Sequence, residues 1–441
     1  MRNDASLPMI ATSMEDSGIV VRYIYSACIV TSTKDVRVLH DPWFTEGIYD
    51  GSWFHYPKVL DPIKSIGDVD LIYISHIHPD HYDVTFLRKY FSVYGLKEVI
   101  IADHDPNYLA GKMRADGIKA SILPDGRRIG NTEIRILPHK TGSTSDIDSA
   151  IVIKYFEGAR SHCVVNANDI IFDDTMISSL KAAANEPDIL LCGYTGAGPY
   201  PQTYFDLSNP RFREEATKKK LAFFARYKRL TDSMNAKVNI PFAGKYLLGG
   251  RLVALNKYRG VADQTEVLAL DEKAIVLADN GGEVGTADLS PSAVRTRKYD
   301  AGDIDARERE IASRKMDYER LIPAEEIYQL PLKRLLMSAA RRASKMSECD
   351  TDYFFIFNLP DNERAQVNAN KSAGCLIEFL GSNAVLPQPR SEIEIDPRYL
   401  FGLLTNVYHW NTAEVGSQYN TRRTPDLLNR KAQVFLNYLA I

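Results

Sequence analysis

The stretch LIYISHIHPDH, residues 71–81, decides the fold. Leu71 to Ser75 is a nearly continuous apolar run, as expected for a strand buried on both faces. His76-Ile77-His78-Pro79-Asp80-His81 follows it directly. Because so many polar groups are costly to desolvate, they need a compensating partner. Neutral imidazole and carboxylate are ligands of zinc and iron, so we predict a metal site where this strand ends.

The segments around this stretch alternate between strands and helices. Residues 19–31 and 36–40 are β-rich and flank a turn-forming stretch, which predicts a hairpin. Three strand-like runs separated by turn signals lie within residues 119–155 and indicate a second sheet. Further elements are expected as helices at 83–90, 107–115, 173–184 and 211–235, and as strands at 98–102, 188–192 and 238–240. The fold class is therefore α/β (α+β).

The pattern of charged and apolar residues changes at two points in the second half of the chain. Charge dominates residues 300–320, which predicts an exposed helix that bridges two bodies. The pattern restarts beyond Ser347, with strands expected at 353–358 and 375–380 and a helix at 399–405. We therefore predict three parts: residues 1–300 as a metal-binding catalytic domain, 301–345 as a helical connector and 346–441 as a C-terminal α+β unit.

Composition excludes several function classes. A formal net charge of −3 and a pI near 6.3 give no global attraction to phosphate backbones, so no nucleic-acid partner is expected. No apolar segment is long enough to cross a bilayer, and no signal peptide is recognised, so no membrane partner is expected. The five cysteines form no CxxC pair, which favours a reducing, cytoplasmic location.

The motif HxHxDH after an apolar strand resembles the signature of the metallo-β-lactamase superfamily. That resemblance implies an αββα sandwich holding one or two metal ions, iron or zinc, at the sheet edge. Three further stretches resemble the motifs that accompany the signature: Asp41-Pro42-Trp43, Leu137-Pro138-His139 with Asp148-Ser149-Ala150, and Asn166-Ala167-Asn168-Asp169.

The resemblance also implies a set of ligands. His76, His78 and His139 would hold the first metal, and the second would be held by Asp80, His81 and Asp169. Asp173 and Asp174 compete with Asp169 for its role. Hydrolases of the superfamily usually supply one more histidine, but after His162 only His409 follows.

A closer resemblance links residues 15–300 to the metal domain of CMP-N-acetylneuraminate hydroxylases. It rests on GYTGAGPYP at 193–201 and IPFAGKY at 240–246, and in that family the Pro-Phe-Ala-Gly turn stands where hydrolases place their last histidine. The substrate contacts it implies are Tyr194, Gly196, Gly198, Tyr200 and Lys245. Those hydroxylases carry a Rieske cluster, but this chain has no Cys-x-His ligand pairs, so no iron–sulfur cluster is expected in it.

The C-terminal unit is similar to sterol-carrier-like modules in its strand pair, its Tyr408-His409-Trp410-Asn411 turn and its closing helix. An ordinary dimerisation or lid domain is the alternative.

Three functions remain. The first is a non-haem monooxygenase with one or two iron ions that hydroxylates a small polar or sugar/nucleotide-like molecule and takes electrons from an external electron-transfer protein. The second is a zinc or two-metal hydrolase of phosphoesters, lactones or amides, in which Asp80 orients a metal-bound water. The third is a non-catalytic metal-binding protein. The missing last histidine favours the oxygenase.

Overall fold

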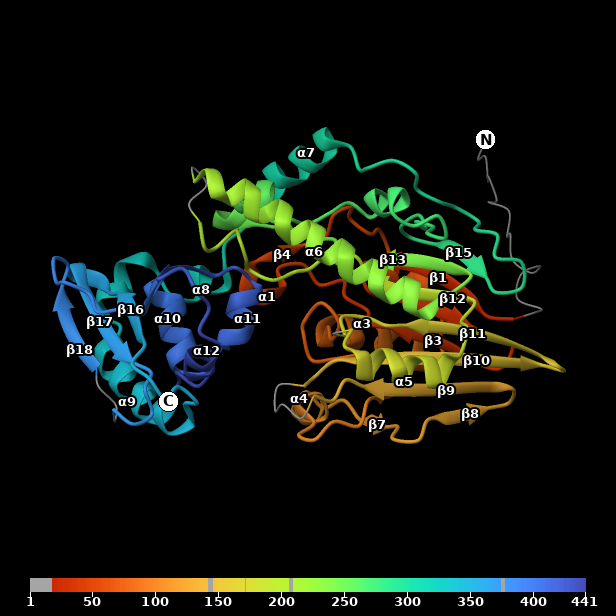
Figure 1. Cartoon of the computed structure of the whole chain (residues 1–441), viewed down its shortest axis with the longest axis horizontal. Helices are drawn as coiled ribbons and strands as arrows, with labels where there is room; N and C mark the ends of the chain where they lie inside the picture. The colour runs from red at the N-terminus through yellow and green to blue at the C-terminus, as the bar shows by residue number, and fades with distance from the viewer. Residues whose placement is uncertain (1–17, 142–145, 171, 206–208, 374–376) are drawn as a thin grey trace, which may run out of the picture.

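The computed structural model describes residues 18–141, 146–170, 172–205, 209–373 and 377–441. They form a larger α/β body, on the right in Figure 1, and a C-terminal body on the left. Within these ranges, no helix has the length and apolar character needed to cross a membrane.

The first sheet has seven strands in the order β15-β1-β2-β3-β5-β6-β7. They are β1 (Val20–Tyr25), β2 (Cys28–Ser32), β3 (Arg37–His40), β5 (Leu71–Tyr73), β6 (Glu98–Ile101), β7 (Ala120–Ile122) and β15 (Gly282–Gly285). Strands β3, β5, β6 and β7 run parallel. Around β5, Leu71 and Tyr73 pack between the two main sheets, whereas Ile72 and Ile74 pack against helices. This two-sided burial explains the apolar run.

The second sheet has six strands in the order β13-β12-β11-β10-β9-β8. They are β8 (Arg127–Ile129), β9 (Thr132–Pro138), β10 (Ser149–Glu157), β11 (Arg160–Asn166), β12 (Ile189–Gly193) and β13 (Val238–Phe242). Strands β8 to β11 pair antiparallel, whereas β11, β12 and β13 run parallel. A separate pair joins β4 (Trp53–Phe54) to β14 (Leu247–Leu248).

Helices cover the outer faces of both sheets. One buried cluster joins the first sheet to α2 (Pro62–Ile66), α3 (Val84–Tyr94) and α4 (Tyr108–Ala115). Another joins the second sheet to α5 (Asp174–Ala184) and α6 (Pro210–Met234), which lie in front of it in Figure 1. A third cluster fills the space between the sheets. The predicted αββα sandwich is therefore confirmed.

Two local predictions need correction. Residues 19–31 form two strands, because the chain turns at Ser26, whose φ is 50°. The charged stretch 300–320 is not one exposed helix: α7 (Ala301–Ile311) and α8 (Asp317–Leu321) are separate helices. Ile311, Met316 and Tyr318 in this stretch are buried, because they pack against the larger body and the C-terminal body.

The C-terminal body is a five-stranded sheet with helices against it. Its strand order is β18-β17-β16-β19-β20. The strands are β16 (Phe354–Asn358), β17 (Glu363–Asn368), β18 (Ile377–Gly381), β19 (Arg390–Ile395) and β20 (Tyr419–Thr424), and the helices are α9 (Leu332–Met346), α10 (Pro397–Leu404), α11 (Trp410–Val415) and α12 (Arg430–Asn437). The first two residues of the strand predicted at 375–380 lie outside the described residues. Short 3-10 helices complete the chain at η1 (Gly250–Tyr258), η2 (Gln264–Ala269), η3 (Ala324–Gln329) and η4 (Pro360–Asn362).

The C-terminal body docks on the short turn α1 (Ile48–Gly51) of the larger body. Gln418 donates its side-chain N–H to the carbonyl of Tyr49 over 2.8 Å, and the Ser52 hydroxyl donates to the carbonyl of Gly416 over 2.6 Å. One continuous apolar cluster also spans the junction, from Trp53 to Trp410. The two bodies therefore share a core and hold a fixed relation to each other.

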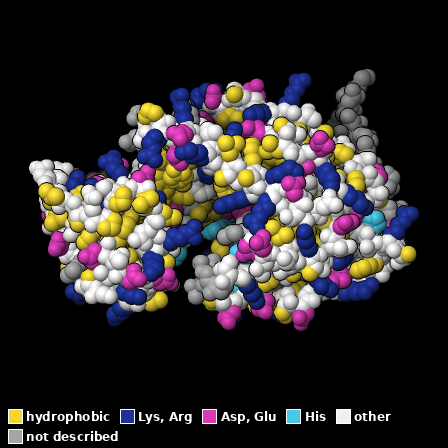
Figure 2. Space-filling view, in the orientation of Figure 1, with side chains coloured by type: hydrophobic (Ala, Val, Ile, Leu, Met, Phe, Trp, Pro, Cys, Tyr) yellow, Lys and Arg dark blue, Asp and Glu magenta, His cyan; other side chains and the backbone are white. Residues whose placement is uncertain are grey.

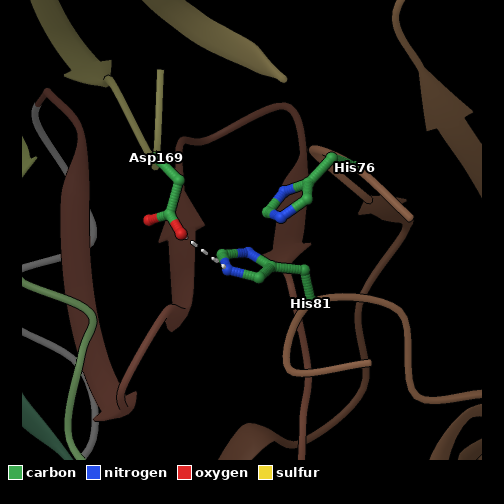
Figure 3. Close-up of side chains that lie close together, drawn as sticks. All are labelled: His76, His81 and Asp169. Carbon is green, nitrogen blue, oxygen red and sulfur yellow. Dashed lines mark ion pairs between the residues drawn. The ribbon is translucent and has the colours of Figure 1, made fainter. Parts of the chain in front are cut away.

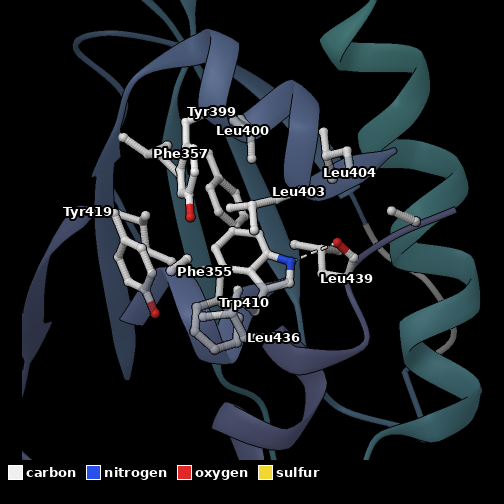
Figure 4. Packing of buried hydrophobic residues seen from close by; sticks show 14 of the residues in the cluster. Phe355, Phe357, Tyr399, Leu400, Leu403, Leu404, Trp410, Tyr419, Leu436 and Leu439 are labelled. Carbon is white, nitrogen blue, oxygen red and sulfur yellow. Dashed lines mark hydrogen bonds between the residues drawn. The ribbon is translucent and has the colours of Figure 1, made fainter. Parts of the chain in front are cut away.

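Trp410 anchors the C-terminal core (Figure 4). It is 1% exposed and donates its indole N–H to the carbonyl of Leu439 over 2.8 Å. Replacing Trp410 with alanine should lower the free energy of unfolding by about 3–5 kcal/mol, because a large cavity replaces packed atoms. Guanidinium titration measures this, with the exposed Val407→Ala as a control expected to change stability by less than about 0.5 kcal/mol. Equal stability of the two variants would contradict this packing.

Candidate metal centre

The polar residues of the site come from the ends of several strands at one edge of the sandwich. Asp41 follows β3, the loop 76–81 follows β5 closely, His139 follows β9 and Asp169 follows β11 after a short turn. Because parallel strands end at the same edge of a sheet, distant motifs meet there. Motifs that lie far apart in the sequence thus bring their side chains into a single cluster.

His76, His81 and Asp169 form the centre of this cluster. Each offers one ligand atom, and these atoms all lie within 4.8 Å of one another. Figure 3 shows both imidazoles and the Asp169 carboxylate turned toward a common point. The His81 Nε2 to Asp169 Oδ2 distance is 3.5 Å. The structure therefore favours Asp169 over its competitors: Asp173 caps α5 and Asp174 pairs with Arg229.

The outer nitrogen of each of these imidazoles is held by the protein. Asp41 Oδ2 lies 3.1 Å from His81 Nδ1, and Asp41 Oδ1 accepts the backbone N–H of Ser75 over 2.7 Å. The Ser75 hydroxyl lies 3.0 Å from His76 Nδ1, with Asp148 Oδ1 3.8 Å away from the same nitrogen. Both Nε2 atoms therefore face the common point, the arrangement in which a histidine binds a metal through one nitrogen and is oriented through the other.

The carboxylates at the centre carry more negative charge than one protonated imidazole can balance. Burial alone would lower the pKa of His81, but the charges of Asp80, Asp41 and Asp169 outweigh it and raise that pKa well above its usual value. Burial lowers the pKa of His76 well below its usual value, with help from neighbouring histidines. Three carboxylates thus surround one imidazole, and a second imidazole is neutral and ready to act as a ligand.

The other predicted ligands lie around this centre at different distances. His78 Nδ1 is 2.9 Å from His76 Nε2, and Asp80 Oδ2 is 3.5 Å from His81 Nε2. His139 instead places its Nε2 3.2 Å from Asp173 Oδ2 and is absent from the three-residue group among the described residues. The structure thus brings five of the six predicted ligands together and leaves His139 at the margin, beside Asp173.

The residues present fit a metal ion. Two nitrogens bound to one ion at about 2.1 Å lie roughly 3 Å apart, which matches the spacing of His76 Nε2 and His78 Nδ1. Asn168 is buried beside the centre, and its Oδ1 has no hydrogen-bond partner among the described residues. A buried acceptor of this kind calls for a bound ion or water. The negative charge of the centre, its set of ligand atoms and the unpaired Asn168 oxygen all favour a bound cation.

A cavity of about 540 Å³ opens beside the centre. Figure 2 shows histidine side chains at the hollow between the two bodies. Gly193, the last residue of β12, and residues 195–198 line one wall, and Ala243 and Gly244 after β13 line another. A side chain at Gly196 would overlap the Phe223 ring, with a Cβ only 1.9 Å from its Cζ. A larger residue at this position would therefore require the Phe223 side chain to move.

The five predicted substrate contacts separate into two groups. Gly196 and Gly198 line the cavity. Tyr194 is buried in the core between the second sheet and its helices. Tyr200 donates its hydroxyl to Glu215 over 2.6 Å, and Lys245 Nζ lies 4.2 Å from the centre of the Tyr299 ring. The side chains of Tyr194, Tyr200 and Lys245 therefore contact other parts of the protein instead of lining the cavity.

Several residues that line the cavity were not among the predicted site residues. Tyr49 donates its hydroxyl to Asp80 Oδ1 over 2.5 Å, and Val415 of the C-terminal body lines the same cavity. Asp148, whose pKa is raised to about 7 by burial and by the charge of Asp169, also lines it. Phe223 carries the guanidinium of Arg226 over its ring at 4.9 Å. Only Asp148 had a sequence signal, its place in the motif with His139.

The comparisons with known proteins agree with this geometry. Residues 20–144 match the family described as "Beta-lactamase superfamily domain". A putative Rieske 2Fe-2S iron-sulfur protein of Mycolicibacterium smegmatis is 28% identical over 180 residues, which cover 38% of this chain and 32% of that protein. The cytidine monophosphate-N-acetylneuraminic acid hydroxylase of Danio rerio is 22% identical over 251 residues, which cover 54% of this chain and 40% of the hydroxylase. The chain therefore spans less than half the length of these curated relatives.

Among solved structures, the isothiocyanate hydrolase from Delia radicum gut bacteria aligns with 60% of this chain and 98% of its own, at 16% identity and a TM-score of 0.41. A structural similarity this low does not support an inference about function.

The sandwich and the histidine motif agree with the family match, so residues 20–144 resemble a domain of the β-lactamase superfamily. Over 54% of its length, the chain is also similar at low identity to a cytidine monophosphate-N-acetylneuraminic acid hydroxylase.

Replacing His81 with alanine should weaken metal binding by more than about 100-fold, because even residues that only orient a ligand contribute about 10–100-fold. Elemental analysis after dialysis measures the metal retained. The matched control is His162→Ala, since His162 lies on β11 and contacts Thr286 at 3.0 Å, away from the centre. Equal metal content in the two variants would remove His81 from the ligand set.

Proposed function

We propose that the protein is a non-haem iron monooxygenase that hydroxylates a small polar, sugar- or nucleotide-like molecule. The observation that carries the proposal is the central group of two histidines and one carboxylate, His76, His81 and Asp169. Two histidines and a carboxylate with open positions are the ligand set of many ferrous oxygenases.

The character of the surrounding site supports the same reaction. Ala243 and Gly244 line the cavity after β13, so no imidazole is supplied from that turn. Asp80 and Asp169 both lie 3.5 Å from His81 Nε2, and Asp148 lines the same cavity. A second metal here would be held mainly by carboxylates, which suits two-iron chemistry better than two-zinc hydrolysis.

Iron bound at this centre would activate dioxygen. The hydroxylation balances as R–H + O2 + 2 e⁻ + 2 H⁺ → R–OH + H2O, and an external electron-transfer protein supplies the electrons. Tyr49 holds Asp80 by its hydrogen bond, and Asp41 holds His81, so both side chains are oriented before substrate enters. The chain's own contribution is thus orientation of the ligands and enclosure of the substrate.

The walls of the cavity support a substrate with a flat, polar or anionic part. Gly196 and Gly198 allow the backbone to approach a ligand closely. Beside this loop, Phe223 offers an aromatic face, and the Arg226 guanidinium over its ring offers a positive charge. Sugars and nucleotides combine these features.

Dioxygen uptake tests the reaction. Metal-free protein is loaded with Fe²⁺ under nitrogen, freed of excess iron and mixed with air-saturated buffer containing ascorbate as reductant. We expect uptake that is lost in Asp169→Asn and kept in Asp174→Asn, because Asp174 is exposed and bound to Arg229. Equal uptake in both variants contradicts the proposal. Hydrolysis of a phosphoester, a lactone or an amide by the zinc-loaded protein also contradicts it.

A further inference from the structure

The third imidazole of the centre is held from the far end of the chain. His78 Nε2 lies 3.0 Å from the side-chain oxygen of Asn411, which stands 333 positions later in the sequence on α11 of the C-terminal body. The other nitrogen of the ring, Nδ1, faces His76 Nε2. An amide oxygen can only accept a hydrogen bond, so this contact favours the tautomer with the ring proton on Nε2 and the lone pair on Nδ1, the nitrogen that faces the centre.

We infer that Asn411 is a positioning residue of the metal centre, and that the C-terminal body thereby completes the site of the larger body. The pattern of the other ligands supports this role. Asp41 holds the outer nitrogen of His81, and Ser75 holds that of His76. Asn411 gives His78 the same kind of partner, so each of the three imidazoles is oriented through the nitrogen that faces away from the metal.

The position of Asn411 is itself fixed by the fold. His409 is the N-terminal cap of α11, and its Nδ1 accepts the backbone N–H of Asn411 over 3.2 Å. The end of α11 is pinned to α1 by the bond from Ser52 to Gly416 and by Gln418. These contacts fix the backbone of Asn411 beside His78, and orientation of a ligand requires such a rigid support.

This role explains why His409 is not one of the residues of the metal group. Its ring caps the helix that carries Asn411, so His409 acts on the metal centre only indirectly, through Asn411. The inference rests on the proposed metal centre, but it does not depend on whether the reaction is oxygenation or hydrolysis.

Metal affinity of three variants tests the inference. Metal-free protein is titrated with Zn²⁺ alone against a chromophoric chelator. Asn411→Leu removes the acceptor and should weaken binding about 10–100-fold, whereas Asn411→Asp keeps an acceptor and should stay close to the parent. Asn420→Leu, the same change on β20 of the C-terminal body, is the matched control and should bind as the parent does.

A second readout separates positioning from folding. The metal-free Asn411→Leu protein should melt at the same temperature as Asn420→Leu, and the ¹⁵N signals of His78 should move from one tautomer toward a mixture. If Asn411→Leu binds Zn²⁺ as tightly as Asn420→Leu, or if Asn411→Asp is as weak as Asn411→Leu, the inference is overturned. Failure of the parent to bind Zn²⁺ at all would instead overturn the proposed metal centre.

Discussion

The contact between Asp41 and His81 is the constraint on which the rest of the site depends. Both side chains are buried, with exposed fractions of 0% and 1%. A buried carboxylate is costly alone, and burial raises the pKa of Asp41. His81 and the backbone N–H of Ser75 offset that cost by hydrogen bonding to its two oxygens. The loop 76–81 can therefore occupy only a narrow range of positions after β5.

Backbone conformation at the site shows that this position is enforced. Asp41, Asn168 and Ala243 all have positive φ, at 40°, 46° and 67°. Residues other than glycine adopt this region at a cost of order 1 kcal/mol or more, and such strain persists only where surrounding contacts outweigh it. The sheets, their covering helices and the docked C-terminal body supply those contacts. The fold thus holds these residues in place, and catalysis at a metal requires such preorganisation.

Local spacing predicted the histidine loop, and the family resemblance implied Asp169. The contacts made by the docked C-terminal body could not be predicted from either. His76, His81 and Asp169 stand in motifs next to strands, and the strand pattern predicted both sheets. Asn411 is 333 positions from His78, and no periodicity or motif links them. The Gly-rich segment after β12 was correctly placed at the cavity, but it was not predictable that Tyr194 would turn into the core. A strand reverses the direction of its side chains at each residue, so a shift of one position moves a tyrosine from cavity to core.

The metal content of the protein tests the central claim most directly. The protein is expressed in medium that supplies both iron and zinc, purified without added metal or chelator, and analysed for both elements. The account predicts iron bound in stoichiometric amount, with an absorption spectrum that differs between air and nitrogen. Stoichiometric zinc without iron would contradict the oxygenase, and the absence of any bound metal would contradict the metal centre itself.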